Sequence, residues 1–181
     1  FLSYYEICEK LKNGWIDNLS NTKDNLPYAY NSNEWIAYEN SLSIKTKSSY
    51  IKDKSLGGAL IFALDTDDFN GEFCNKGKYP LINSIKNEFL TSKFTKINQI
   101  TENLKNDKYF ICYYTNWSQY RPEPGTFFPE NIDPNLCTHI VFAFAKVVGD
   151  NIEPYEWNDQ DNGLNEGIRF IKIIRFLICD K

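Results

Sequence analysis

The sequence predicts an α/β fold built around a parallel sheet. Three short apolar runs, at 59–64, 109–114 and 139–145, are unbroken by charged residues, which is typical of strands buried on both faces. Segments with helical spacing of apolar residues precede these runs. The order of helix then strand, repeated along the chain, indicates strands joined by helical crossovers. No repeat with a period of about 20–50 residues is present, which argues against a solenoid.

The first forty residues are expected to hold one helix and two short strands. Residues 1–13 fit a helix, because Tyr4 and Cys8 fall near one face of it. The next stretch mixes Asn, Gly, Pro and aromatic residues, which favours turns. Short strands are predicted within it around Tyr28–Tyr30 and Trp35–Tyr38.

A second helix is predicted over residues 41–54. Asn40 fits its N-cap position, since an Asn side chain can accept a backbone N–H, and Gly57-Gly58 lies just past the helix end. The first apolar run, 59–64, follows as a strand. Pro80 then opens the next helix, where its missing N–H is tolerated.

The second half of the chain is expected to hold two more strands. Residues 95–108 are polar and fit either a linker or a continuation of the preceding helix. The strands 109–114 and 139–145 follow, with a helical turn or two within 129–136. Residues 160–181 stay unassigned, because they fit an amphipathic helix but also sequence from a wrong reading frame or an intron.

The composition excludes several classes of function. The net charge is −4 and no basic block occurs, so nucleic acid is not an expected partner. No apolar run approaches the roughly 18 residues that cross a membrane. One His and no Cys-x-x-Cys pair leave no usual zinc site, and we expect no metal and no cofactor. The chain begins at Phe1, contains no Met and is shorter than the roughly 250 residues of a complete eight-stranded barrel, so we expect a processed chain or a fragment.

The cysteines indicate the compartment. Five Cys are scattered along the chain, which suggests structural disulfides and an oxidising environment. Two N-glycosylation tripeptides, at Asn18 and Asn116, are compatible with this. We therefore expect a secreted, extracellular protein.

The most acidic segment of the chain is 65–72. Its carboxylates could include a catalytic pair. The interpretation we favour is a solvated strand-to-helix loop with capping carboxylates. A calcium loop does not fit, because Phe69 and Asn70 stand where ligand and glycine positions are needed. The four carboxylates belong to Asp65, Asp67, Asp68 and Glu72.

Aromatic residues make up 16% of the chain, and four of them surround the end of the second predicted strand. The carboxyl ends of parallel barrel strands form an active-site face, where flat rings can stack on the C–H bonds of a sugar. Packing beneath a loop explains the same residues equally well. The four are Tyr113, Tyr114, Trp117 and Tyr120.

At these residues the chain resembles the family 18 glycoside hydrolases, the animal chitinases and chitinase-like lectins. The segment 112–122, CYYTNWSQYRP, is similar to the first barrel strand of that family. Residues 129–139, PENIDPNLCTH, resemble the path into strand 2. Residues 142–145, FAFA, resemble strand 2 itself, and 156–159, EWND, the turn after it.

The first half of the chain resembles the other end of the same family. Residues 4–8, 27–30 and 33–38 are similar to its small α+β insertion domain. Residues 57–65, GGALIFALD, resemble strand 8, and 73–82, FCNKGKYPLI, the entry to helix 8.

This resemblance implies part of a (β/α)8 TIM barrel together with part of an α+β insertion domain. Residues 1–94 would be the C-terminal part of one chitinase-like module, with the insertion domain, strand 8 and helix 8. Residues 95–108 would be a linker, and 109–159 the N-terminal part of a second module, with strands 1 and 2. The alternative is one rearranged barrel in which strand 8 leads directly to strand 1.

The resemblance also implies a ligand, chitin or its oligosaccharides. The family's catalytic motif on strand 4, Asp-x-x-Asp-x-Asp-x-Glu, ends in the Glu that protonates the glycosidic oxygen, and the motif is absent here. No catalytic residue is therefore assigned. Phe62 stands where the family usually has Trp, which keeps a ring but loses area. The residues implied to bind sugar are Tyr113, Trp117, Phe144 and Phe62, with Glu6 a weaker candidate on the insertion domain.

Three functions stay open at this point. The chain is a fragment of an enzyme and inert by itself, or a chitin-binding lectin, or a secreted scaffold with no sugar function. The resemblance further implies two disulfides, Cys8 with Cys74 and Cys112 with Cys137. Cys179 is then left free or paired between chains.

Overall fold

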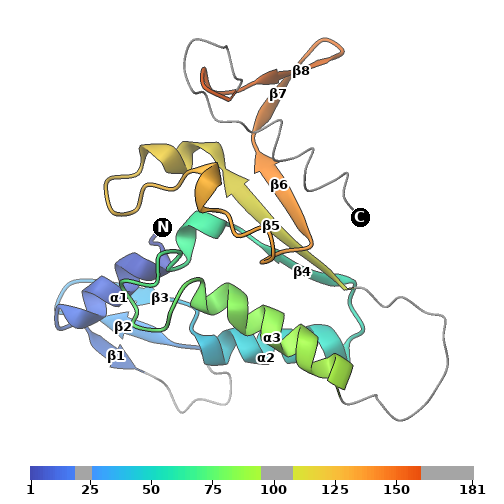
Figure 1. Ribbon diagram of the computed structural model, residues 1–181. Helices are drawn as coiled ribbons and strands as arrows, with labels where there is room; N and C mark the ends of the chain where they lie inside the picture. The colour runs from blue at the N-terminus through green and yellow to red at the C-terminus, as the bar shows by residue number, and fades with distance from the viewer. Residues whose placement is uncertain (19–25, 95–107, 160–181) are drawn as a thin grey trace. The chain divides into compact units, whose positions relative to one another are not determined.

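The computed structural model describes residues 1–18, 26–94 and 108–159 (Figure 1). These belong to two compact units. The first unit comprises Phe1–Ala59 and Thr66–Phe110, and the second comprises Leu60–Asp65 and Ile111–Lys181. Both units therefore contain chain from either side of residues 95–107. The expected linker and the unassigned tail, including Cys179, lie outside the described residues.

The first unit begins with helix α1 (Tyr4–Lys12), which confirms the helix predicted over 1–13. A small antiparallel sheet follows, with the strand order β1-β2-β3. Strands β2 (Tyr28–Tyr30) and β3 (Trp35–Ala37) were expected, whereas β1 (Ile16–Asn18) was not. This strand is only three residues long, and its place is set by pairing with β2 rather than by local apolar alternation.

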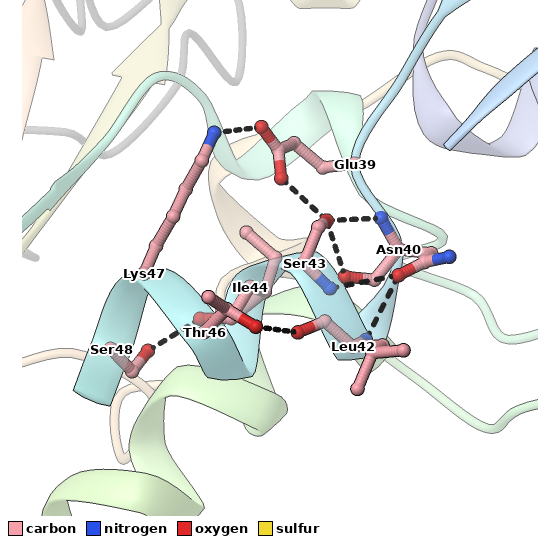
Figure 2. A network of polar contacts seen from close by, with 8 residues as sticks. All are labelled: Glu39, Asn40, Leu42, Ser43, Ile44, Thr46, Lys47 and Ser48. Carbon is pink, nitrogen blue, oxygen red and sulfur yellow. Dashed lines mark hydrogen bonds and ion pairs between the residues drawn. The ribbon is translucent and has the colours of Figure 1, made fainter. Parts of the chain in front are cut away.

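Helix α2 (Ser41–Asp53) begins at the predicted cap, Asn40. The Asn40 side chain accepts hydrogen bonds from the backbone N–H groups of Leu42 and Ser43, both at 2.9 Å (Figure 2). In return, the Ser43 hydroxyl accepts from the Asn40 N–H at 2.9 Å and donates to Glu39 at 2.6 Å. Lys47 closes the network through an ion pair with Glu39. Two of the helix's unpaired N–H groups are thus satisfied by one side chain.

Helix α3 (Pro80–Phe94) lies beside α2 in the first unit (Figure 1). Two lysines of α2 hold its Glu88, Lys52 with Nζ to Oε2 at 3.0 Å and Lys45 with Nζ to Oε1 at 3.5 Å. The hydrogen bond from Lys52 lowers the pKa of Glu88 below its ordinary value. The disulfide Cys8–Cys74 ties α1 to the segment that leads into α3, as the resemblance implied.

A second sheet has three strands, in the hydrogen-bonded order β4-β5-β6. Its strands are β4 (Gly58–Ile61), β5 (Tyr109–Thr115) and β6 (His139–Ala143). Strands β5 and β6 run parallel, with Thr115 opposite Ala143 at the carboxyl ends, which confirms the predicted parallel sheet. No barrel closes among the described residues, since the strands form this sheet, the β1–β3 sheet and one two-stranded hairpin.

The connections within the second unit are short 3-10 turns and a hairpin. The turns are η1 (Leu64–Thr66), which straddles the unit boundary, η2 (Asn116–Tyr120) and η3 (Pro129–Asn131). The third predicted strand, 139–145, ends early at Ala143. Beyond it, β7 (Ala145–Val148) and β8 (Asn151–Pro154) form an antiparallel hairpin that was not expected.

One face of β5 packs against the loop that follows it. The Tyr114 ring stacks on Phe142 of β6 at 6.1 Å between centroids and also contacts Phe127, at 6.0 Å. The disulfide Cys112–Cys137 joins β5 to the segment before β6, again as implied. Tyr114, Phe127 and Cys112 are all fully buried, so this face is a core.

Burial of all three strands on both faces was predicted, and for β4 this is wrong. Leu60 keeps 57% of its surface exposed. Strand β6 is only partly buried along most of its length. The apolar runs therefore indicate strands correctly, but three strands bring too few neighbours to cover both of their faces.

Candidate functional site

Four of the five side chains implied to bind sugar lie in the second unit, as two ring pairs. Phe62 follows β4 and contacts Tyr113 of β5, with ring centroids 5.3 Å apart. Trp117 lies in η2, directly after β5, and contacts Phe144, which follows β6, at 5.5 Å. We refer to these as the two ring pairs. Phe62, Trp117 and Phe144 all lie beyond the carboxyl ends of strands, where a parallel sheet places its binding residues.

The two ring pairs present apolar faces to solvent. Phe62 is 52% exposed, Phe144 48% and Trp117 37%, and Tyr113 is half-buried. Large rings in a folded chain usually bury most of their surface. Rings that stay this exposed and in mutual contact form a surface on which a flat, apolar ligand face can stack.

Tyr114, which the sequence grouped with these rings, does not belong to them. Its side chain points to the opposite face of β5 from Tyr113 and is fully buried. Burial raises the pKa of its hydroxyl well above the ordinary value. Packing beneath a loop, the other interpretation of the aromatic set, is therefore correct for Tyr114.

The turn η2, which carries Trp117, is stabilised by hydrogen bonds from one of its own residues, Ser118. The Ser118 hydroxyl donates to the backbone oxygen of Thr115 at 2.6 Å and to that of Phe127 at 2.9 Å. Ser118 is fully buried, so these bonds are shielded from water. They fix the turn against the loop that leads to η3.

The residues after the β7–β8 hairpin hold η2 from another side. Asn116 donates from Nδ2 to the Asp159 carboxylate, at 3.0 Å to Oδ2. Asp159 also accepts from the backbone N–H of Glu156 at 2.8 Å. The Tyr120 hydroxyl donates to Glu156 at 3.1 Å, and its pKa is raised by burial and by this bond. Sequence reasoning missed the role of Asp159, since its partner Asn116 lies 43 residues away.

The burial of Asn116 also corrects an expectation about glycosylation. Asn116 begins one of the two tripeptides that fit N-glycosylation, but its side chain is buried and bound to Asp159. A glycan needs an exposed amide nitrogen. The folded chain cannot carry one at this position.

The acidic segment 65–72 is not the solvated loop that was favoured. Asp65, Asp67 and Asp68 are fully or almost fully buried. Asp67 accepts from the backbone N–H groups of Leu81 and Ile82 at 3.1 and 3.0 Å, so it caps α3 as predicted. Burial raises its pKa from 3.8 to about 6, against the opposing effect of these amides.

The other carboxylates of this segment are also accounted for. Asp68 accepts from the N–H groups of Gly71 at 2.9 Å and Cys74 at 2.7 Å, which shapes the loop before α3. Asp65 is bound to Thr115 and Arg121 in the second unit. Glu72 is exposed. Among the described residues, no group of three or more His, Cys, Asp or Glu side chains is arranged to hold a metal ion.

Glu6, the fifth implied sugar contact, belongs to the first unit. Its carboxylate accepts from the Ser3 N–H and the Ser3 hydroxyl, both at 2.6 Å. Both bonds are made by Oε2, and they cap α1. Glu6 as a sugar contact stays a prediction. In the described part of the chain, no helix has the length and apolarity that a membrane crossing requires.

Comparison with known proteins gives one family. The family described as "Glycosyl hydrolases family 18" matches residues 1–67 and 109–176. Probable chitinase 10 of Drosophila melanogaster is 29% identical over 231 residues, which cover 93% of this chain and 10% of that protein. Chitinase-3-like protein 2 of Homo sapiens is 44% identical over 86 residues, covering 48% of this chain and 22% of that protein.

Solved structures were compared as well. Human YKL-39, described as a pseudo-chitinase with retained chitooligosaccharide binding properties, is 42% identical with a TM-score of 0.45, over 49% of this chain and 24% of that one. The chain thus spans about a quarter or less of each of these three proteins.

Proposed function

Because the chain belongs to the family 18 glycosyl hydrolases, we propose that it is a sugar-binding part of a secreted chitinase-like protein, and that it binds chitin oligosaccharides without cleaving them. The two ring pairs support this most directly. They place four aromatic residues of the second unit at or beyond the carboxyl ends of β4, β5 and β6, with three of the rings broadly exposed. Clustered aromatic rings that remain exposed to solvent are typical of surfaces that bind a ligand.

In this proposal β4, β5 and β6 are strands 8, 1 and 2 of a (β/α)8 barrel, and the β1–β3 sheet is part of the insertion domain. The hydrogen-bonded order β4-β5-β6 supports it, because strands 8 and 1 are neighbours in a closed barrel.

The pairing of β4 with β5 fits one rearranged barrel, in which strand 8 leads directly to strand 1. In the other arrangement the two halves come from consecutive modules, so that residues 1–94 end one module and 109–159 begin the next. The Drosophila relative supports the arrangement in consecutive modules, because one alignment over 231 residues covers 93% of the chain and only 10% of that protein. A long protein that contains both kinds of segment in this order is expected to hold several modules one after another.

The absence of cleavage follows from the carboxylates. The chain lacks the Asp-x-x-Asp-x-Asp-x-Glu motif that supplies the proton donor in the family it belongs to. Of the clustered alternatives, Asp67 and Asp68 are bound to backbone amides and Asp65 to Arg121. A general acid must reach the glycosidic oxygen, and these groups are committed elsewhere. The binding-only function, that of a lectin, is therefore the one proposed for this chain.

Secretion is proposed on the two disulfides, Cys8–Cys74 and Cys112–Cys137. Such bonds persist in oxidising compartments and are rare in the cytosol.

A fluorescence titration with N-acetylchitopentaose tests the proposal. Stacking on one or two rings is worth about 1–3 kcal/mol, by analogy with bases on aromatic side chains, so we expect millimolar affinity. Trp117→Ala should abolish binding. Trp35→Ala is the matched control, since Trp35 is exposed in the β1–β3 sheet and should leave the affinity unchanged. Equal binding by Trp117→Ala and the parent chain would rule out the Trp117–Phe144 pair as part of the site, and equal binding by Phe62→Ala as well would rule out both pairs.

A further inference from the structure

We propose that Asp65 is a positioning residue for the sugar-binding surface, because it holds both ends of the turn that carries Trp117. This inference rests on the proposed function for its consequence in binding, but its geometric content stands on its own. Asp65 lies in η1, after β4, and takes no part in the two ring pairs.

The contacts of Asp65 bracket η2. The Thr115 hydroxyl donates to Oδ1 at 2.9 Å, and Thr115 is the residue directly before η2. Arg121 donates from Nε to Oδ2 at 2.9 Å, and its Nη2 forms an ion pair with the same oxygen, also at 2.9 Å. Arg121 is the residue directly after η2. One carboxylate therefore spans the five-residue turn, with Trp117 as the second residue between the two anchors.

Burial makes these contacts strong. Asp65 is 1% exposed and Thr115 is also buried, whereas a quarter of the Arg121 side chain is accessible. Bonds between a guanidinium and a carboxylate are shorter and stronger than neutral ones, and removing one partner of a buried pair leaves the other charge uncompensated. Without the carboxylate, Arg121 gains by moving toward water, and the end of η2 moves with it.

The rest of the turn cannot compensate for this loss. Asn116, Ser118 and Tyr120 are bound to Asp159, to the backbone and to Glu156, respectively. These bonds fix the middle of η2 against the hairpin and the following loop. Through these two partners, Asp65 joins both ends of η2 to the chain after β4, which also carries Phe62 of the other ring pair. We therefore assign to Asp65 the relative placement of the two ring pairs.

The test uses a chain in which Trp15, Trp35 and Trp157 are changed to Phe, so that Trp117 is the only tryptophan and can be excited selectively over the tyrosines. Two buried carboxylates of the same segment are compared in this background, Asp65→Asn and the matched control Asp67→Asn. Asp67 caps α3 in the first unit, whereas η2 belongs to the second. The two readouts are acrylamide quenching of Trp117 and affinity for N-acetylchitopentaose.

We expect Asp65→Asn to change the quenching constant of Trp117 and to weaken binding about tenfold, which is the effect of losing one well-formed contact. Asp67→Asn should leave both values at those of the parent. The double variant Asp65→Asn/Arg121→Gln removes the unpaired charge as well, and it should regain stability without regaining the quenching constant or the affinity. If Asp65 contributed to stability alone, the double variant would regain its stability, its quenching constant and its affinity together.

Unchanged quenching and affinity in Asp65→Asn would overturn the inference. If Asp65→Asn does not fold, Arg121→Gln gives the same test from the other partner, with the same expected and contrary results. If the parent chain binds no sugar while Asp65→Asn still alters Trp117 quenching, the proposed function fails and the positioning role of Asp65 stands.

Discussion

Asp67 shows at the scale of one residue how burial and hydrogen bonding compete. Its side chain is buried, which favours the protonated acid, while the amides of Ile82, Asp68 and Leu81 favour the carboxylate. The charge of the neighbouring Asp68 also favours protonation. Burial outweighs the amides and raises the pKa to about 6.

This pKa predicts an unusual pH dependence. The folded-state pKa of about 6 lies above the unfolded value of 3.8, so the folded chain binds the extra proton between them. The contribution of Asp67 to the free energy of unfolding is complete below the pKa that Asp67 has in the unfolded state. It is lost as the pH rises through the pKa that Asp67 has in the folded state. Relative to Asp67→Asn, the free energy of unfolding of the parent should fall by up to about 3 kcal/mol over this range. Urea titrations across the range measure it, and a rise instead would show that the amides hold Asp67 ionised.

Gly58 is a second residue whose identity the structure explains. A Cβ atom on Gly58 would lie 1.8 Å from the backbone oxygen of Tyr109, the first residue of β5. Gly58→Ala should therefore lower stability by about 2 kcal/mol or more, because neither backbone can give way. Gly57→Ala, at a position with nothing within 4 Å of the added carbon, is the control. Equal melting of the two variants would contradict the close approach.

Sequence reasoning found the ring residues but not what positions them. Phe62, Tyr113, Trp117 and Phe144 came from a resemblance to family motifs, and the structure brings them together in pairs. Asp65 was noted only as part of an acidic segment. Its partner Arg121 lies 56 residues away, and nothing local distinguishes a carboxylate bound to a distant guanidinium from a solvated one.

Among the elements, α2 was the easiest to predict, because its start depends on local chemistry. Asn40→Ala removes the acceptor for two backbone N–H groups and should cost about 1 kcal/mol of stability. Asn33→Ala, at an exposed turn position, is a matched substitution that should cost much less. Chemical denaturation compares them, and equal losses would mean that the cap contributes nothing.

The β7–β8 hairpin was missed, although the chain carries a signal for it. Val148 pairs with Asn151, so the turn consists of Gly149 and Asp150. Gly followed by Asp between two short β-prone runs is a common two-residue hairpin turn. The apolar run predicted as one strand over 139–145 extends into the hairpin, and this hides the turn signal. Strand β1 had no such signal, since three residues are too few to show alternation.

For the whole molecule, the main question is how three strands of a parallel sheet remain folded. The outer strands of the sheet, β4 and β6, have no further strand beside them among the described residues, and Leu60 of β4 is largely exposed. Unpaired strand edges and uncovered faces lower stability. The two disulfides, with sequence separations of 66 and 25 residues, offset part of this by roughly 3–4 kcal/mol each.

We therefore expect the purified chain to be marginally stable. Calorimetry should show a broad transition below about 60 °C, within the range of mesophile domains. Reduction of the disulfides should lower it further. A sharp, cooperative transition above that temperature would mean that the described elements form a more complete core than the exposed strands suggest.

The proposed function requires that the chain keep a sugar-stacking surface and lack a proton donor for cleavage. The most direct measurement is the turnover of a fluorogenic N-acetylchitobioside by the purified chain and by Glu72→Gln, which removes the exposed carboxylate of the acidic segment. We expect no turnover above background for either protein, because a general acid must lie within hydrogen-bonding reach of the glycosidic oxygen. Turnover by the parent chain that is lost in Glu72→Gln would contradict this expectation and would make the acidic segment a catalytic site.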